Sequence, residues 1–294
     1  MFKGIITALV TPFKNGKFDS KAFEGLVDWQ IKEGVHGLAI NGTTGESPTI
    51  EEDELTQMIN IAVNTSNGRV PVIIGTGSNS TKKTIQLTQT AQKMGASAAM
   101  VVAPYYNRPS QAGLYEHYKT IHDESDLPII IYNVPSRTAV DISGDTIGKL
   151  AELPRIIGVK ECSADVNRPV NLGRIIDSLG RDNFVMFTGN DPEALSFGAS
   201  GGKGCISVTS NVAPKALAHM QELMMSGNFT GAREVHKKML LLHNAMFCEV
   251  NPVPVKYALS LMGRISDEVR LPLVGLSEAN KNKVEDAMKA IGLI

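Results

Sequence analysis

The sequence predicts an α/β fold, a closed (β/α)8 TIM barrel with a C-terminal helical extension. Short β-rich runs recur about every 30 residues, and most are continuously apolar, as strands buried on both faces of a parallel sheet are. Helical patterns lie between them. Strand–helix alternation sustained eight times favours a closed barrel over a doubly wound open sheet, the alternative. The expected strands are Gly4–Val10, His36–Asn41, Val70–Thr76, Ala98–Ala103, Pro128–Val134, Ile156–Lys160, Phe184–Thr188 and Gly204–Thr209.

The helical patterns carry their own start and stop signals. Ser20 can cap the first helix, and Gly34 follows its end. Thr49 and Glu52 form a capping-box pattern ahead of the second helix, and Gly180 ends a later one. Apolar residues recur at helical spacing, so each helix can bury one face. They include Phe23, Leu26, Val27 and Ile31, then Leu55, Met58, Ile59 and Ala62, and then Leu172, Ile175, Ile176 and Leu179.

Beyond the last expected strand the pattern is purely helical. We expect residues 1–225 to form the catalytic barrel and residues 226–294 to form a helical extension packed on it, because no Ser/Gly-rich tether separates the two. The expected helices are Pro214–Met225, Phe229–Leu242, Pro254–Met262 and Glu278–Ile291.

Composition excludes several classes of protein. The 294 residues are 43% hydrophobic and 20% charged, so a large core is possible. The net charge is −1 and the sequence shows no basic stripe of the kind that binds nucleic acid. No run approaches the roughly 18 apolar residues of a membrane span, and the N-terminus lacks a signal-peptide pattern, which favours a cytoplasmic protein. The cysteines and histidines show no metal-ligand spacing, so we expect no metal site.

Lys160 is the most informative polar residue. It ends the apolar run Ile156–Val159, and barrel enzymes place their active sites at the C-terminal ends of the strands. Burial of a lysine lowers its pKa, and a neutral amine is the nucleophile that Schiff-base chemistry needs. On strand periodicity Gly158 points to the same side and leaves room beside the lysine stem. The alternative is a surface lysine that reaches solvent.

Other polar side chains follow neighbouring strands. Tyr132 occupies the equivalent position one strand earlier, where a phenol can relay protons. Thr43 and Thr44, between two glycines, offer backbone N–H groups and hydroxyls to a carboxylate, and Arg137 can bind a carboxylate through two hydrogen bonds. Taken singly, each also fits a structural role. Gly75-Thr76-Gly77 lacks the third glycine of a dinucleotide fingerprint.

These stretches together resemble the pyruvate-dependent class I aldolase family, which contains dihydrodipicolinate synthases and N-acetylneuraminate lyases. The resemblance covers essentially the whole chain. Its carriers are Gly42-Thr43-Thr44-Gly45-Glu46-Ser47, Pro104-Tyr105-Tyr106-Asn107-Arg108-Pro109, Tyr132-Asn133-Val134-Pro135-Ser136-Arg137-Thr138, Gly158-Val159-Lys160-Glu161 and Gly204-Cys205-Ile206-Ser207-Val208-Thr209.

The resemblance implies a catalytic set of four residues. Lys160 matches the lysine that condenses with the ketone of pyruvate. Tyr132 matches the tyrosine that relays protons, and Thr43 and Tyr106 match its hydrogen-bonded partners, with the tyrosine at Tyr106 reaching in from a neighbouring subunit. A homotetramer built from two tight dimers is the assembly that the family implies.

The resemblance also implies the substrate contacts. Thr44 matches the residue that holds the pyruvate carboxylate, and Gly189 and Ile206 match positions that line the pocket through backbone groups. Arg137 matches the arginine that binds the carboxylate of L-aspartate 4-semialdehyde, which favours the synthase branch over the sialic-acid lyases. The family needs no metal and no organic cofactor. The alternative from another class is a non-catalytic barrel that binds a keto acid as a sensor.

Feedback inhibition by lysine is expected to be weak or absent. Family members inhibited by lysine carry a histidine and a glutamate at an effector site between subunits, and those positions are Leu55 and Lys83 here. A cationic Lys83 repels the ammonium group of lysine, and Leu55 cannot hydrogen-bond it. Activity measured over a lysine titration tests this, and strong inhibition at physiological lysine concentrations would contradict it.

Overall fold

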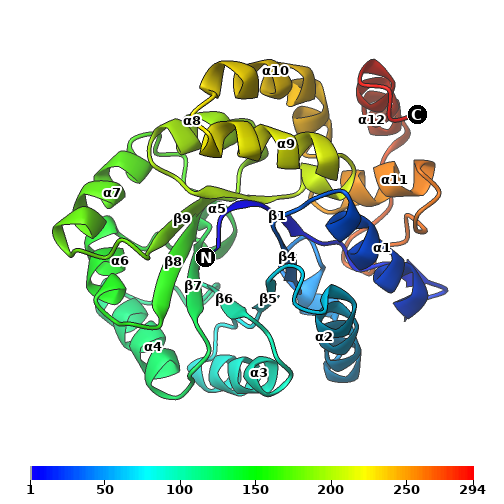
Figure 1. The fold of residues 1–294 in the computed structure, drawn as a ribbon. Helices are drawn as coiled ribbons and strands as arrows, with labels where there is room; N and C mark the ends of the chain where they lie inside the picture. Colours follow the sequence, from blue (N-terminus) through cyan, green and yellow to red (C-terminus); the bar gives the residue numbers. More distant parts are fainter. Residues whose placement is uncertain (1) are drawn as a thin grey trace.

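Eight parallel strands close into a barrel in the computed structural model, which describes residues 2–294 (Figure 1). Each strand pairs with its neighbours in chain order, and the first strand closes on the last. The prediction of a (β/α)8 barrel is confirmed. The strands are β1 (Gly4–Ala8), β4 (Gly37–Ile40), β5 (Val72–Gly75), β6 (Ala98–Val102), β7 (Ile129–Asn133), β8 (Ile156–Glu161), β9 (Val185–Thr188) and β10 (Gly204–Ser207).

A ring of helices surrounds the strands (Figure 1). A small hairpin of β2 (Phe13–Lys14) and β3 (Lys17–Phe18) precedes the first helix, and single helical turns follow three of the strands. The helices are α1 (Ser20–Lys32), α2 (Glu52–Ser66), α3 (Thr81–Lys93), α4 (Gln111–Asp123), α5 (Pro135–Thr138), α6 (Gly144–Ala151), α7 (Arg168–Ser178), α8 (Ala194–Ala199) and α9 (Pro214–Met225), and the turns are η1 (Ser47–Thr49), η2 (Asp191–Glu193) and η3 (Thr209–Asn211).

Two predicted helix caps are wrong by one or two residues. Asp19, not Ser20, caps α1, and its carboxylate accepts a hydrogen bond from the Ala22 N–H at 3.0 Å. Helix α2 begins after Glu51, whose N–H donates to the Glu54 side chain at 3.1 Å. The predicted cap of α2 is instead the last residue of η1, because the proline within Ser47–Thr49 starts a separate turn.

Both faces of each barrel strand are buried, which explains the continuous apolar runs. Along β7, Ile129 and Ile131 pack outward against the helices, whereas Ile130 and Tyr132 face the barrel interior. The interior layer is small and mostly aliphatic. It consists of Ile6, Ala8, Ala39, Ile73, Ala98, Met100, Ile130, Tyr132, Val134, Val185, Phe187 and Ile206.

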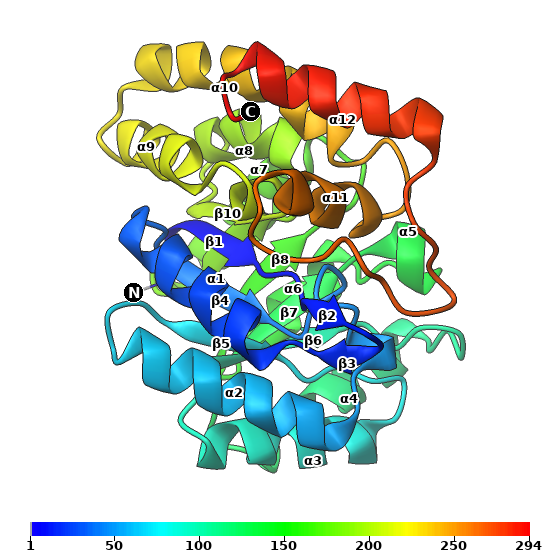
Figure 2. The same ribbon diagram turned by 90° about the vertical axis from the view of Figure 1, so that its right-hand side faces the viewer.

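The extension lies along one side of the barrel. It consists of α10 (Phe229–Ala245), α11 (Val253–Leu261) and α12 (Glu278–Ala290), with α10 packed on α9 and with α12 across both α10 and α11 (Figure 2). Its apolar side chains continue the cluster that lies between the strands and the surrounding helices. Within residues 2–294 no helix is both long and apolar enough to cross a membrane.

We expect His117 to weaken folding in mild acid. It is buried on α4, its Nδ1 lies 2.9 Å from Thr81 Oγ1, and burial lowers its pKa from 6.5 to about 4. Between these two values the unfolded chain binds a proton that the folded chain excludes, so stability falls as the pH falls. His117 should therefore cost about 2 kcal/mol of unfolding free energy between about pH 7.5 and about pH 5.

Urea unfolding of the wild type and of His117→Gln at both pH values measures this contribution. The variant should lose less stability on acidification by about that amount. Equal losses in the two proteins would contradict the prediction.

Candidate active site

Lys160 and Tyr132 lie side by side inside the C-terminal end of the barrel. The register of β7 and β8 pairs them directly, and Lys160 Nζ lies 4.2 Å from the centre of the Tyr132 ring. Their exposed fractions are only 6% and 5%. The alternative interpretation of Lys160, a side chain that reaches bulk solvent, does not fit this burial.

An irregularity in β8 turns Lys160 inward. Ile156 and Val159 both belong to the outer apolar layer, although strict alternation would put residues three apart on opposite faces. The register shifts at the same place, where Ile129 pairs with Ile156 but Ile130 pairs with Gly158. The extra residue reverses the alternation, so the residue after Val159 faces the interior.

The expected role of Gly158 is wrong, and Gly189 has that role instead. A Cβ on Gly158 would lie 2.4 Å from the Val185 carbonyl oxygen, so this glycine allows close approach to β9 at the irregularity. A Cβ on Gly189 would lie 2.6 Å from Lys160 Cε and 2.2 Å from Cys162 Sγ. The room beside the lysine stem therefore comes from Gly189, after the next strand.

The charge of Lys160 depends on its neighbours. Burial lowers its pKa, but Tyr132, Cys162 and Cys205 outweigh burial in their ionised forms and hold the pKa above the usual value, contrary to the expectation from burial alone. Burial raises the pKa of the Cys162 thiol to about 11 and that of Cys205 well above its usual range. Both thiols are thus neutral near pH 7, where their stabilisation of the ammonium is absent.

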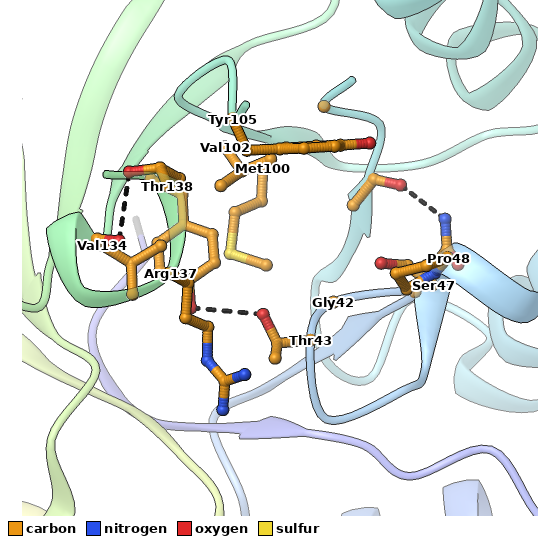
Figure 3. Close-up of a pocket in the computed structure, with 14 residues that line it drawn as sticks. Gly42, Thr43, Ser47, Pro48, Met100, Val102, Tyr105, Val134, Arg137 and Thr138 are labelled. Atoms are coloured by element: carbon orange, nitrogen blue, oxygen red, sulfur yellow. Dashed lines mark hydrogen bonds between the residues drawn. The ribbon is translucent and has the colours of Figure 1, made fainter. Parts of the chain in front are cut away.

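A cavity of about 240 Å³ opens beside Tyr132 (Figure 3), and Lys160 is not among the residues that line it. Tyr132 lines it, and the Tyr132 hydroxyl lies 3.4 Å from Thr43 Oγ1. Arg137 and Tyr105 also line it, and the exposed Arg137 lies at its rim. The structure thus groups a phenol, a hydroxyl and a guanidinium around one space, and the lysine amine lies next to the phenol ring.

Thr44 and Ile206 are buried and do not line this cavity. The Thr44 hydroxyl accepts a hydrogen bond from Asn251 Nδ2 at 2.9 Å. Ile206 belongs to the interior apolar layer and pairs with Ile6 across the closure of the barrel. Sequence reasoning missed Asn251 because it lies more than 200 residues away, in a segment without strands.

Tyr106 is not part of this group within one chain. Its exposed fraction is 90%, and its backbone φ of 73° lies in the left-handed region. The preceding residue, Tyr105, faces the cavity instead. The other predicted members of the proton relay, Thr43 and Tyr132, are within reach of each other.

A buried polar network supports the segment that carries Arg137. Asn133 Nδ2 donates to Glu161 Oε1 at 2.9 Å and to Asp141 Oδ1 at 2.7 Å, and Asn133 Oδ1 accepts from the Ile142 N–H at 3.1 Å. Both ends of the segment are therefore fixed to β7. Burial raises the pKa of Glu161. The only sequence signal for this network was Glu161, the charged residue that directly follows Lys160.

The described part of the chain has no set of side chains arranged as metal ligands. Residues 2–294 contain no group of three or more His, Cys, Asp or Glu side chains placed to bind a metal ion.

Comparison with known proteins gives a consistent result. The model of the dihydrodipicolinate synthetase family matches residues 1–291. A 4-hydroxy-tetrahydrodipicolinate synthase from Thermodesulfovibrio yellowstonii is 48% identical over 294 residues and is covered completely, as is this chain. The solved structure of the chloride-inhibited dihydrodipicolinate synthase from Acinetobacter baumannii complexed with pyruvate is 43% identical, with a TM-score of 0.96 and full coverage of both chains.

A second solved structure bears on assembly. It is described as the first monomeric dihydrodipicolinate synthase variant, is 44% identical and has a TM-score of 0.98. The match covers 100% of this chain and 98% of that one.

Proposed function

This chain belongs to the dihydrodipicolinate synthetase family, and we propose that it condenses pyruvate with L-aspartate 4-semialdehyde through an imine on Lys160. The product is 4-hydroxy-tetrahydrodipicolinate, a precursor of diaminopimelate and lysine. The observation that carries the proposal is the burial of Lys160 beside Tyr132 at the end of an apolar strand. The amine faces a phenol and two thiols, and none of these is a permanent countercharge.

The reaction starts at the amine. Neutral Lys160 Nζ attacks the ketone carbon of pyruvate, and loss of one water gives an imine. The imine withdraws electrons, so the pyruvate methyl group loses a proton and becomes an enamine carbon. This carbon attacks the aldehyde, whose oxygen takes a proton to become the hydroxyl. The substrate's own amine then attacks the imine carbon, closes the ring and releases Lys160.

Tyr132 and Thr43 are placed to move these protons. The Tyr132 hydroxyl can give a proton to the leaving water and later to the new hydroxyl group, and Thr43 lies within reach to pass it on. We assign the third member of the relay to Tyr106 of the partner subunit, since Tyr106 of the same chain is almost fully exposed. The proposed assembly is a homotetramer made of two such dimers.

Two carboxylates need binding sites. We assign the pyruvate carboxylate to the Thr44 hydroxyl and the N–H groups of its loop, and the backbone groups of Gly189 and Ile206 to the pocket lining. Arg137 at the rim binds the carboxylate of the aldehyde substrate through its planar guanidinium. An aldehyde with a carboxylate fits this arginine, which supports the synthase over a sialic-acid lyase.

The proposed chemistry uses no metal and no organic cofactor, because the lysine imine supplies the electron sink. We propose a cytoplasmic location, since both substrates are small, charged metabolites of a biosynthetic reaction. The competing function, a barrel that only binds a keto acid, has no use for a buried amine beside a phenol.

Incubation with pyruvate and borohydride tests the nucleophile, since reduction converts an imine into a stable amine. We expect one pyruvyl adduct per chain, located by peptide mapping on Lys160. Lys160→Ala should form no adduct and lose activity by a factor of about 10³ or more. Lys203→Ala, an exposed lysine outside the site, is the matched control and should keep the adduct. A wild-type protein without an adduct, or with adducts spread over surface lysines, would contradict the proposed nucleophile. It would favour the alternative of a barrel that only binds a keto acid.

Mixed dimers test the shared tyrosine. Tyr106→Phe and Lys160→Ala chains should each be nearly inactive alone, but a mixed dimer contains one site with Lys160 from one chain and Tyr106 from the other. Random mixing should therefore restore about one quarter of wild-type activity, because half of the dimers are mixed and half of their sites are complete. Mixing Tyr132→Phe with Lys160→Ala is the control and should restore nothing, since both residues act within one chain. Failure of the first mixture would remove Tyr106 from the relay.

A further inference from the structure

Glu46 adopts a backbone conformation that disfavours its own side chain. Its φ of 57° lies in the left-handed region, where glycine is the usual residue. The residue before it is Gly45, so the chain has a glycine next to this position but not at it. Glu46 is also 3% exposed, which is rare for a carboxylate without a partner. A glutamate here indicates that the side chain has a specific partner.

That partner is Lys256 in the C-terminal extension. Lys256 Nζ lies 2.7 Å from Glu46 Oε1, and the exposed fraction of Lys256 is 0%. The ammonium also donates to the Thr11 carbonyl oxygen at 2.8 Å and lies 4.2 Å from the centre of the Phe13 ring. The second carboxylate oxygen of Glu46 accepts from the Arg270 N–H at 3.0 Å. Burial lowers the pKa of Lys256, and the adjacent carboxylate opposes this effect.

Two further contacts hold the same loop. The Thr11 hydroxyl donates to the Gly45 carbonyl oxygen at 2.7 Å. Asn251, five residues before Lys256, donates to the Thr44 hydroxyl at 2.9 Å. A hydroxyl that accepts one hydrogen bond keeps its own hydrogen to donate, so this contact leaves Thr44 able to bind an anion.

We propose that the Lys256–Glu46 ion pair positions the Gly42–Ser47 loop for binding the pyruvate carboxylate, which makes the C-terminal extension a positioning element of the active site. The proposal rests on the proposed function, because it takes Thr44 as the carboxylate ligand. The loop turns on itself through the Glu46 N–H, which donates to the Thr43 carbonyl oxygen at 3.1 Å. A shift of Glu46 therefore moves both threonines.

The pair could instead serve stability alone, and the experiment has to separate the two roles. Removal of one partner leaves an unpaired buried charge and risks unfolding, whereas replacement of both by apolar residues is often tolerated. The informative variant is therefore Glu46→Leu combined with Lys256→Met. Tyr257→Phe and Leu259→Ala are controls on the same helix. The first loses a 2.8 Å hydrogen bond to Glu285, and the second leaves a cavity in the core, whereas the ion pair with Glu46 is left in place.

The readout is the pyruvate concentration that gives half-maximal borohydride trapping, measured on folded protein together with kcat at saturating pyruvate. We expect the double variant to need about tenfold more pyruvate while kcat changes by less than about threefold, because a displaced carboxylate site weakens binding before it affects chemistry. Both controls should keep the wild-type pyruvate dependence, even though Leu259→Ala lowers the unfolding temperature.

A folded double variant with wild-type pyruvate dependence would overturn the inference, as would a fall in kcat that merely follows the fraction of folded protein. A wild-type protein that forms no pyruvyl adduct would be a different result, because it contradicts the proposed function itself.

Discussion

The site depends on the irregular pairing of β7 with β8. If the strands paired without the shift at Ile130, Tyr132 would lie opposite Val159, and strict alternation from Ile156 would turn Lys160 toward the outer helices. The inserted residue changes both the pairing and the orientation of Lys160. It places the lysine opposite Tyr132 and turns its side chain toward the barrel interior. A bulge of this kind needs a neighbouring strand that can come close. Gly158 allows this approach, because a Cβ at its position would collide with β9.

Lys160 in the barrel and Lys256 in the extension are both buried, and their environments differ in kind. Lys256 has a carboxylate at 2.7 Å and a carbonyl oxygen at 2.8 Å, so it can remain charged at zero exposure. The groups that most affect Lys160 are Tyr132 and two thiols, and the thiols are neutral near pH 7. An unpaired buried charge costs on the order of several kcal/mol. The same fold thus gives Lys256 a carboxylate partner, whereas the groups beside Lys160 oppose its charge only when they are ionised.

The sequence predicted what depends on local pattern. Apolar runs gave the strands, and polar residues at their ends gave Lys160 and Tyr132, because the C-terminal ends of parallel strands meet at one end of a barrel. Other features depend on contacts between distant segments. The room beside Lys160 comes from Gly189 on a different strand end, and the hydrogen-bond partner of Thr44 comes from the extension. A one-residue irregularity leaves no trace in an apolar run, since either register buries the same residues.

On our proposal, one loop serves two active sites because of its backbone. Tyr105 lines the cavity of its own chain, whereas Tyr106, whose backbone is left-handed, directs its own side chain outward. Tyr105 lines the cavity and Tyr106 is 90% exposed, an arrangement that suits the proposed contact between two copies. A relative described as monomeric has almost the same fold, so the barrel itself does not determine assembly. On our proposal a monomer would keep Lys160, Tyr132 and Thr43 but would lack the third hydroxyl, so assembly would affect proton transfer more than formation of the imine.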